Sequence, residues 1–330
     1  MPEKAAVIGS NSFSGSHLVD FLLLQGLEVL GVSRSLEPHP VFLPYRDNGR
    51  RDSFSFLQAD LNLDFDRLLA ALDSFQPGIV VNFAAQGMVA QSWQAPEQWL
   101  RTNTLAMVRL HEALRRRDYL KVFVQASTPE VYGDVSGRIT EDAPYNPSTP
   151  YAVSKAACDM SLMAFVRNYR FPAVLTRSAN VYGPGQQLYR IIPRTILAIL
   201  TGGKLALQGG GNSLRSFIHI RDVAEATWLA ARKAPAGSIV HLGTGTEISI
   251  RQLVETICGL MGADFSKTVD LVPARAGQDS AYRLDCAEAR RLLDWQPKVS
   301  LQAGLEQTIS WVKANLAVLR EQPLEYTHKD

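Results

Sequence analysis

The sequence predicts an α/β protein with a doubly wound parallel sheet and a smaller, mixed α/β domain at its C-terminal end. In about the first 180 residues, short and nearly continuous apolar runs alternate with segments that carry apolar residues at helical spacing. Parallel strands have this pattern because helices bury both faces of their sheet. After residue 180, glycine-rich turns and further helices replace that alternation. We therefore expect a sheet domain over residues 1–180, with a return segment near 215–235, and a second domain formed mainly by residues 181–330.

Each predicted element rests on the period of its apolar residues. Six buried strands are expected at residues 5–8, 29–32, 54–58, 79–83, 122–125 and 173–176. Helices are expected between them at 16–25, 66–75, 99–117 and 151–169. The second part predicts helices at 191–200, 222–232, 250–261, 288–293 and 300–316. Strands that are separated by helices favour crossover connections, and hence strands that run parallel.

The composition excludes several classes of protein. With 330 residues, 46% of them hydrophobic, the chain can bury a core, so a disordered protein is excluded. A net charge of +2 is too weak a field to bind nucleic acid. No apolar run reaches the length of about 18 residues that a membrane span requires. The 3 cysteines fit neither a metal-binding spacing nor a disulfide framework, so we expect a reduced, cytoplasmic protein without a metal site.

A glycine-containing turn joins the first predicted strand to the first helix. Gly9 and Gly15 flank Ser12, Phe13 and Ser14 in this turn. Backbone N–H groups and the helix N-terminus here would face a pyrophosphate, as in a Rossmann-type dinucleotide-binding fold. The spacing matches G-x-x-G-x-x-G, except that Ser12 stands at the middle glycine. An ordinary strand-to-helix turn is the alternative interpretation.

The ends of the next strands indicate which dinucleotide would bind. A carboxylate at the end of the second strand accepts from the ribose 2′-OH of NAD, whereas an Arg accommodates the 2′-phosphate of NADP. Here Ser33 and Arg34 follow that strand, and Glu37 is the next carboxylate. We predict an NAD(P) cofactor and favour NADP; if Arg34 is a solvated loop residue, NAD remains. Asp60 and Leu61 end the third strand and are expected near the adenine.

The end of the fourth strand carries small residues. Ala84, Ala85 and Gln86 follow it and predict a floor beneath the cofactor. Small side chains there leave room for a bound dinucleotide against the edge of the sheet.

A Tyr and a Lys four residues apart supply the predicted catalytic chemistry. Tyr151 and Lys155 share one face of a helix. A phenol is a poor base at neutral pH, but a nearby ammonium and the positive nicotinamide ring lower its pKa. Thr128, at the end of the preceding strand, can bond the same substrate hydroxyl. We predict that Tyr151 accepts a hydroxyl proton while hydride leaves for the cofactor; a surface pair is the alternative.

Taken together, these motifs resemble the nucleotide-sugar epimerase/dehydratase group of extended short-chain dehydrogenases. The resemblance implies a tightly held nicotinamide cofactor, a nucleoside-diphosphate sugar substrate gripped by the smaller domain, and a homodimer packed through two long helices. It further implies cofactor contacts and substrate contacts at particular positions. The implied cofactor contacts are Asn103, Ser127 and Val181, and the implied substrate contacts are Asn180, Arg190, Arg215, Arg275 and Asp279. For each Arg, a surface ion pair is the alternative role.

Glu130 indicates which reaction the resemblance implies. In the 4,6-dehydratases a Glu at this position removes the C5 proton of the sugar. Those acting on dTDP-glucose resemble Thr-Asp-Glu, whereas this chain has Thr128-Pro129-Glu130 and so lacks the Asp that serves as the acid. Those acting on GDP-mannose resemble Thr-Ser-Glu and use NADP. We predict a 4,6-dehydratase that oxidises C4, removes the C5 proton with loss of water from C6, and returns hydride to C6.

Other outcomes remain open at this stage. Glu130 could be an exposed turn carboxylate. A 4-epimerase, a reductase of 4-keto-6-deoxy sugars and a nucleoside-diphosphate glucuronate decarboxylase share much of the same pattern. A non-catalytic, cofactor-sensing protein is a different class, and such proteins often lose the Tyr or the Lys. Both are present here.

Overall fold

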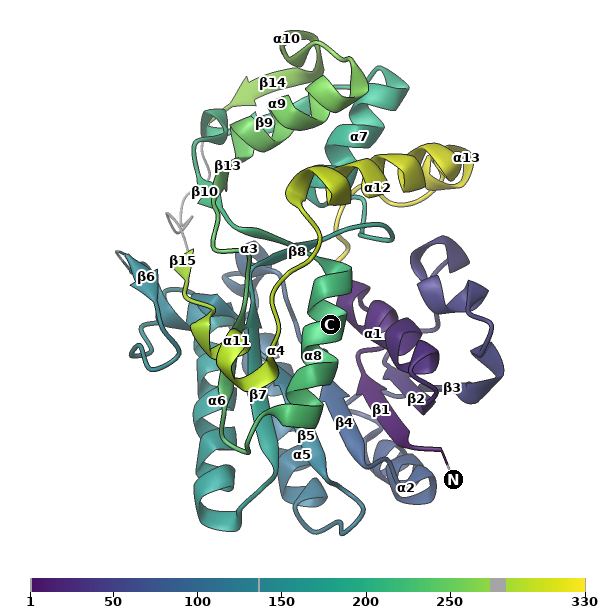
Figure 1. Cartoon of the computed structure of the whole chain (residues 1–330), viewed down its shortest axis with the longest axis vertical. Coiled ribbons are helices and arrows are strands. Elements are labelled where there is room, and N and C mark those ends of the chain that lie inside the picture. Colours follow the sequence, from purple (N-terminus) through teal and green to yellow (C-terminus); the bar gives the residue numbers. More distant parts are fainter. Residues whose placement is uncertain (1, 136, 274–282, 330) are drawn as a thin grey trace.

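Seven parallel strands form the central sheet of the protein. The computed structural model describes residues 2–135, 137–273 and 283–329. The strands lie side by side in the order β12-β7-β5-β4-β1-β2-β3 (Figure 1). This arrangement confirms the predicted α/β fold with a doubly wound parallel sheet. Their bounds are β1 Lys4–Ile8, β2 Glu28–Ser33, β3 Phe54–Gln58, β4 Ile79–Asn82, β5 Val122–Ala126, β7 Ala173–Ser178 and β12 Ile239–Leu242.

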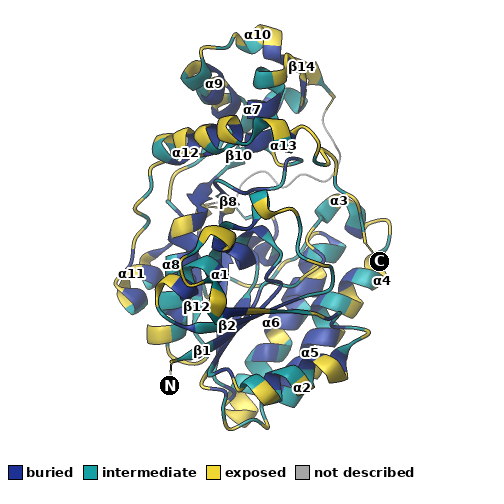
Figure 2. Ribbon diagram, turned by 90° about the vertical axis from the view of Figure 1, so that its right-hand side faces the viewer, coloured by how far each residue is buried: buried dark blue, intermediate teal, exposed yellow. Residues whose placement is uncertain are grey.

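Helices cover both faces of the sheet, which explains its nearly continuous apolar strands. One face packs against α2 (Phe65–Phe75), α5 (Ala106–Leu114) and α6 (Pro150–Tyr169). The other face packs against α1 (Phe13–Leu24), α8 (Ile220–Lys233) and α11 (Ala287–Leu293). Figure 2 shows most of the central strands in the colour of buried residues, whereas the edge strand β3 and the outer sides of the helices are partly exposed. The apolar cores on the two faces of the sheet thereby hold the strands, and the residues at their ends, in fixed positions.

Two features of this domain differ from the sequence-based prediction. The seventh strand, β12, was not predicted, because it is four residues long and lies between Gly237 and Gly243. The helix expected at residues 99–117 is interrupted: α4 (Pro96–Leu100) is followed by a π-helical turn at Arg101–Leu105 and then by α5. Such a turn holds one extra residue, which a count of apolar spacing does not reveal.

A smaller lobe lies beyond the carboxyl edge of the sheet (Figure 1). It contains α7 (Ile191–Thr201), α9 (Ile250–Met261), α10 (Phe265–Thr268), α12 (Leu301–Ala314) and α13 (Leu316–Leu319). Its strands are only paired: β9 (Leu205–Gln208) with β14 (Val269–Val272), and β10 (Leu214–Arg215) with β13 (Ile248–Ser249).

Short strand pairs complete the chain. The parallel pair of β8 (Asn180–Tyr182) and β11 (Phe217–His219) leads from the sheet domain towards the lobe. A second parallel pair joins β6 (Arg138–Ile139) to β15 (Arg283–Leu284). Within the described ranges, every helix is too short or too polar to cross a bilayer.

Candidate active site

A cleft of about 1080 Å³ lies at the carboxyl ends of β1, β2, β3, β4 and β5 and extends to residues of the lobe. In open α/β sheets, ligands bind outside these strand ends. The fold brings most of the predicted site residues together in this one cleft. They are Gly9, Ser12, Phe13, Ser14, Ser33, Arg34, Asp60, Leu61, Ala84, Ala85, Gln86, Ser127, Thr128, Glu130, Tyr151, Lys155, Asn180, Val181, Arg190 and Arg215.

Four predicted site residues are not among the residues that line the cleft. Gly15 packs inside the turn, where a Cβ would lie 2.1 Å from the Gly9 carbonyl oxygen. Asn103 is 1% exposed, and its carboxamide accepts from the Gln86 N–H at 2.8 Å and donates to the Gln86 carbonyl at 3.0 Å. Asn103 therefore fixes the loop after β4 through the backbone of Gln86 and does not itself line the cleft. Arg275 and Asp279 lie outside the described residues.

The turn between β1 and α1 fits a dinucleotide pyrophosphate. Gly9 has φ +86°, and a Cβ on it would lie 2.5 Å from the Ala84 nitrogen, so only glycine fits there. Ser12 is the N-cap of α1: its hydroxyl accepts from the Gly15 N–H at 3.0 Å and donates to the Gly9 carbonyl at 2.7 Å. The hydroxyl thus closes the turn. Phe13 and Ser14, the first residues of α1, line the cleft, so the N-terminus of the helix lies at the cleft, as anion binding requires.

Asn11 fixes the loop after β2. Its backbone N–H donates to the Ser33 hydroxyl at 3.0 Å, and its side chain donates to the carbonyls of Ser35 at 2.8 Å and Leu36 at 3.0 Å. Arg34 is held within this loop. Ser33 is the last residue of β2, and its hydroxyl is already engaged by the Asn11 N–H.

The Thr128 hydroxyl forms hydrogen bonds with both Glu130 and Tyr151 of the predicted catalytic centre. It caps the 3₁₀ turn Pro129–Tyr132, since its hydroxyl accepts from the Glu130 N–H at 3.3 Å. The same hydroxyl is a hydrogen-bond partner of the Tyr151 phenol. Lys155 is buried and donates from Nζ to the Ala126 carbonyl at 2.7 Å. The end of β5 and the first turns of α6 thus meet at one point.

The environment of Tyr151 keeps its phenol protonated. Burial raises the pKa of Tyr151 well above its ordinary value, and the charge of Glu130 raises it further. The hydrogen bond from Thr128 and the charge of Arg190 lower that pKa. Glu130 and Tyr151 are thus close enough to interact electrostatically. Additional positive charge in the cleft is required before Tyr151 can act as a base.

A buried ion pair lies behind this centre, and the sequence analysis did not identify it. Asp159 and Arg177 have fully buried side chains and lie 2.9 Å apart. The Asp159 carboxylate also accepts from the Ser127 hydroxyl at 2.5 Å. Burial raises the pKa of Asp159, while the charge of Arg177 opposes that rise. The pair ties α6 to the ends of β5 and β7, which carry the site residues.

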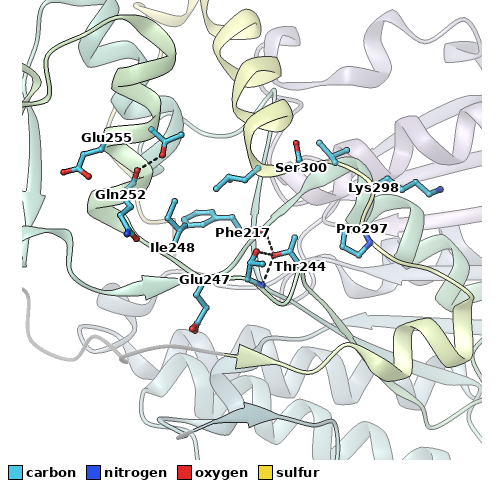
Figure 3. A pocket seen from close by; sticks show the side chains of 13 residues that line it. Phe217, Thr244, Glu247, Ile248, Gln252, Glu255, Pro297, Lys298 and Ser300 are labelled. Atoms are coloured by element: carbon cyan, nitrogen blue, oxygen red, sulfur yellow. Dashed lines mark hydrogen bonds between the residues drawn. The ribbon is translucent and has the colours of Figure 1, made fainter.

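A second groove of about 1010 Å³ lies within the lobe (Figure 3). Phe217, Ile248 and Gln252 come from β11, β13 and α9, while Lys298 and Ser300 precede α12. Figure 3 shows Thr244 and Glu247 between these two sides. None of the described site residues that the sequence predicted lines this groove, so it is distinct from the predicted catalytic centre, although Phe217 lines both.

Comparisons with known proteins show which family the chain belongs to. The family described as GDP-mannose 4,6 dehydratase matches residues 7–308. The chain belongs to the NAD-dependent epimerase/dehydratase family of extended short-chain dehydrogenases. The prediction that the protein is an NDP-hexose 4,6-dehydratase is confirmed. Because it removes water from its substrate, such an enzyme is a hydro-lyase.

Individual members of the family resemble the chain over most of its length. A dTDP-glucose 4,6-dehydratase of Neisseria gonorrhoeae is 30% identical over 339 residues, covering 94% of this chain and 95% of that protein. A UDP-glucose 4-epimerase of Mycolicibacterium smegmatis is 33% identical, covering 94% and 98%. The solved dTDP-glucose 4,6-dehydratase of Streptomyces venezuelae, with NAD and TYD bound, is 31% identical with a TM-score of 0.87, covering 96% and 98%.

Several residues that line the cleft were not predicted from the sequence. Asn11 lies within the glycine turn, and Tyr189 directly precedes Arg190, so their positions beside predicted residues were an available signal. Tyr326 and Lys329 also line the cleft, but they belong to a polar C-terminal segment without any motif. Only the folded chain brings them to this family's cofactor cleft.

Proposed function

We propose that Glu130 is the base that removes the C5 proton in this nucleotide-sugar 4,6-dehydratase. The observation that supports the proposal is that Thr128, Glu130 and Tyr151 line one cleft, where Glu130 is close enough to Tyr151 to raise the pKa of its phenol. A sugar whose C4 hydroxyl bonds Tyr151 then has its neighbouring C5 near Glu130. A carboxylate within reach of that proton is suited to general base catalysis.

The proposed reaction uses the groups of the site in sequence. Thr128 and Tyr151 bind the C4 hydroxyl, and Tyr151 accepts its proton. The bound nicotinamide dinucleotide supplies reversible hydride transfer. The ketone at C4 makes the C5 proton acidic, so Glu130 removes it; protonated Glu130 then donates to the C6 hydroxyl, which leaves as water. Return of the hydride to C6 and addition of a solvent proton to C5 complete the 4-keto-6-deoxy sugar and restore the oxidised cofactor. Glu130 serves as both base and acid because Pro129 stands where related enzymes carry an Asp.

Glu130→Gln tests this assignment. It keeps the shape of the side chain but cannot accept the proton, so we expect dehydration to fall by about 10²- to 10⁴-fold while C4 oxidation still reduces bound cofactor. Exchange of the C5 proton in D₂O is followed by NMR, and reduced cofactor by absorbance. Tyr151→Phe is the matched control and is expected to lose both steps. Unchanged C5 exchange in the Glu130 variant would contradict the proposal.

A 4-epimerase is the second candidate, because an epimerase of Mycolicibacterium smegmatis is among the similar proteins. Epimerisation needs C4 oxidation but no C5 base. An epimerase would therefore convert substrate without loss of water, and Glu130→Gln would leave that conversion intact. Mass spectrometry of the product distinguishes the two reactions.

We further propose that the cofactor is NADP. Arg34 lines the cleft after β2, and the nearest carboxylate in sequence, Glu37, is engaged by the Tyr45 hydroxyl at 2.7 Å and by Arg46 at 2.6 Å. An Arg there suits a 2′-phosphate. The similar dehydratase of Streptomyces venezuelae was solved with NAD, so the affinities must be compared directly. We expect Arg34→Ala to weaken NADP binding about tenfold and NAD binding little; equal wild-type affinities for the two would contradict this proposal.

We propose that residues 1–180 mainly bind the cofactor and that residues 181–330 mainly grip the nucleoside diphosphate. Asn180, Arg190 and Arg215 line the lobe side of the same cleft, and guanidinium groups suit phosphate oxygens. Arg190→Ala is expected to raise the KM for the nucleotide sugar about tenfold without altering cofactor affinity.

A homodimer is proposed as the assembled state. Large apolar side chains are exposed along α4 to α6: Leu100, Leu105, Val153 and Met160 are 40%, 65%, 43% and 55% exposed. An exposed apolar surface of this kind is typical of a helix-to-helix interface. Light scattering is expected to report twice the mass of the chain, and Leu105→Glu is expected to shift it to the monomer.

We also propose that the enzyme works in the reducing cytoplasm. Cys158, Cys258 and Cys286 are buried free thiols, and burial raises the pKa of Cys158 to about 12. Protonated thiols are inert. Titration with a thiol reagent after denaturation is expected to find all of them reduced in freshly isolated enzyme.

A further inference from the structure

The C-terminal tail, defined as residues 324–329, starts on the lobe. Arg194 of α7 pairs with the Glu325 carboxylate at 2.7 Å. The Tyr326 ring packs edge-on against the Tyr189 ring, with 5.6 Å between centroids. Because Tyr189 precedes Arg190 at the start of α7, the tail leaves the lobe beside the residues proposed to grip the substrate.

The other end of the tail is fixed on the sheet domain. The His328 ring stacks on buried Trp99 of α4, with centroids 5.1 Å apart and planes 9° apart. The Lys329 carbonyl accepts from the Gln86 carboxamide at 2.8 Å, and Lys329 Nζ donates to the Ser35 hydroxyl at 2.9 Å. Gln86 follows β4 and Ser35 follows β2, so the tail spans the strand ends on either side of β1.

This span covers the adenosine side of the cleft. In a Rossmann-type fold the residues after β2 meet the ribose of the adenosine. Tyr326 and Lys329 line the same cleft as the glycine turn and Arg34. The tail therefore passes over the region where half of the dinucleotide would lie.

The charges around the tail suit an anionic ligand. The charges of Arg34 and Arg190 both act on the Tyr326 phenol, opposing the rise in its pKa that burial causes. Lys329 makes no ion pair with any described carboxylate, so its charge is not neutralised by the part of the chain that the structure describes. Arg34, Arg190 and Lys329 thus all lie close to the tail, which favours binding of a phosphorylated ligand beneath it.

We propose that the C-terminal tail is a strap over the bound cofactor and that its Lys329 is a cofactor-binding residue at the adenosine end. The proposal rests on the proposed placement of the dinucleotide in this cleft, but not on the choice between NAD and NADP. A dehydratase returns its hydride to the same substrate molecule, so it does not need to release cofactor in each turnover. A strap that slows release is therefore compatible with catalysis.

The experiment measures how fast the full-length enzyme releases bound NADH and NADPH, by stopped-flow fluorescence after mixing with excess oxidised cofactor. Lys329→Gln is expected to speed release about threefold to tenfold, with a larger effect at low salt, because one charge-assisted contact is lost. Removal of residues 324–330 is expected to speed release by about tenfold or more. Thr327→Ala, exposed on the tail, and Lys313→Gln, exposed on α12, are the controls and are expected to change nothing.

A separate variant tests where the cofactor lies. Ser14→Glu puts a carboxylate at the first turn of α1, where it favours the helix but repels a pyrophosphate. If Ser14→Glu leaves cofactor binding unchanged, the placement itself is wrong. If Ser14→Glu abolishes binding but truncation leaves release unchanged, the strap is wrong while the placement stands. Tighter binding after truncation would also overturn the proposal, since it would mean that the tail occupies the cofactor's place.

Discussion

The sheet domain contains a fully buried ion pair, whereas the ion pairs within the described part of the lobe are exposed to solvent. In the sheet domain Asp159 and Arg177 pair with 0% of either side chain exposed. In the lobe Lys204 and Asp270 pair with side chains that are 50% and 59% exposed. The first pair ties the catalytic helix to the strand ends, whereas the second joins β9 to β14 at the surface. The buried pair therefore fixes elements that carry predicted catalytic residues, whereas the core of the lobe consists of apolar side chains.

The largest expected effect comes from breaking the buried pair. Arg177→Met leaves the Asp159 carboxylate buried without its partner, which is expected to cost about 3–5 kcal/mol of unfolding free energy. Urea denaturation followed by circular dichroism measures the change. The double variant Arg177→Met with Asp159→Leu is the control and should recover most of the loss. A cost below about 1 kcal/mol for the single variant would mean that buried charge does not distinguish the two regions.

Acid is expected to weaken the sheet domain through its buried histidines. Burial lowers the pKa of His111 to about 3 and those of His17, His219 and His241 to about 4. In the unfolded chain these histidines bind protons as the pH falls through 6.5, whereas in the folded chain they stay neutral until the pH is much lower. Stability is therefore complete above pH 6.5 and is lost as the pH falls towards 4, by about 1.4 kcal/mol per pH unit for each such histidine.

His111→Leu isolates one of these histidines. Both ring nitrogens of His111 lack a hydrogen-bond partner among the described residues, and Phe123 and Phe171 pack against the ring. The variant is expected to be at least as stable at pH 7, and its loss of stability between pH 6.5 and 5 should involve about one proton fewer. Thermal unfolding over this pH range provides the measurement. An identical pH slope in the two proteins would contradict the interpretation.

A smaller effect is expected from a helix cap in the lobe. Ser249 and Gln252 form a reciprocal capping box at the start of α9. Ser249→Ala is expected to cost about 1 kcal/mol. Because the cap lies in the lobe, cofactor affinity should stay constant; a change in cofactor affinity would show that the two regions are not energetically separate.

The smallest effect is expected at the exposed pair of the lobe. Lys204→Gln should change the unfolding free energy by about 0.5 kcal/mol or less, since solvent screens both charges. Arg251→Gln, which removes another exposed pair in α9, is the matched comparison. A loss as large as that of Arg177→Met would remove the distinction between the two regions.

Much of the fold and of the candidate site follows from local sequence patterns. The strand β3 and the helix α9 have the bounds that their apolar residues predicted, because packing on the core sets the period of those residues. The cleft residues of the glycine turn, the Thr128 strand end and the Tyr151 helix were found because each motif lies at an element's end.

Other features depend on contacts between distant segments, which no local pattern records. Arg177 meets Asp159 across 18 residues, and Lys329 meets Ser35 across 294. The strand β12 is too short to be distinguished by its pattern, since three apolar residues and one His in a row occur in many loops. These contacts exist only because the sheet places its strand ends side by side.

The π-helical turn at Arg101–Leu105 joins α4 directly to α5 and changes which side of the helix faces the sheet before and after it. Before it, Trp99 faces the tail through His328; within it, Asn103 binds the loop after β4 and the Ser154 hydroxyl on the catalytic helix. After it, Met107 faces the core. Each helical residue advances about 100° around the axis. Deleting a single residue from the turn would therefore rotate α4 relative to α5, and the contact of Trp99 with His328 and those of Asn103 with Gln86 and Ser154 could no longer form together.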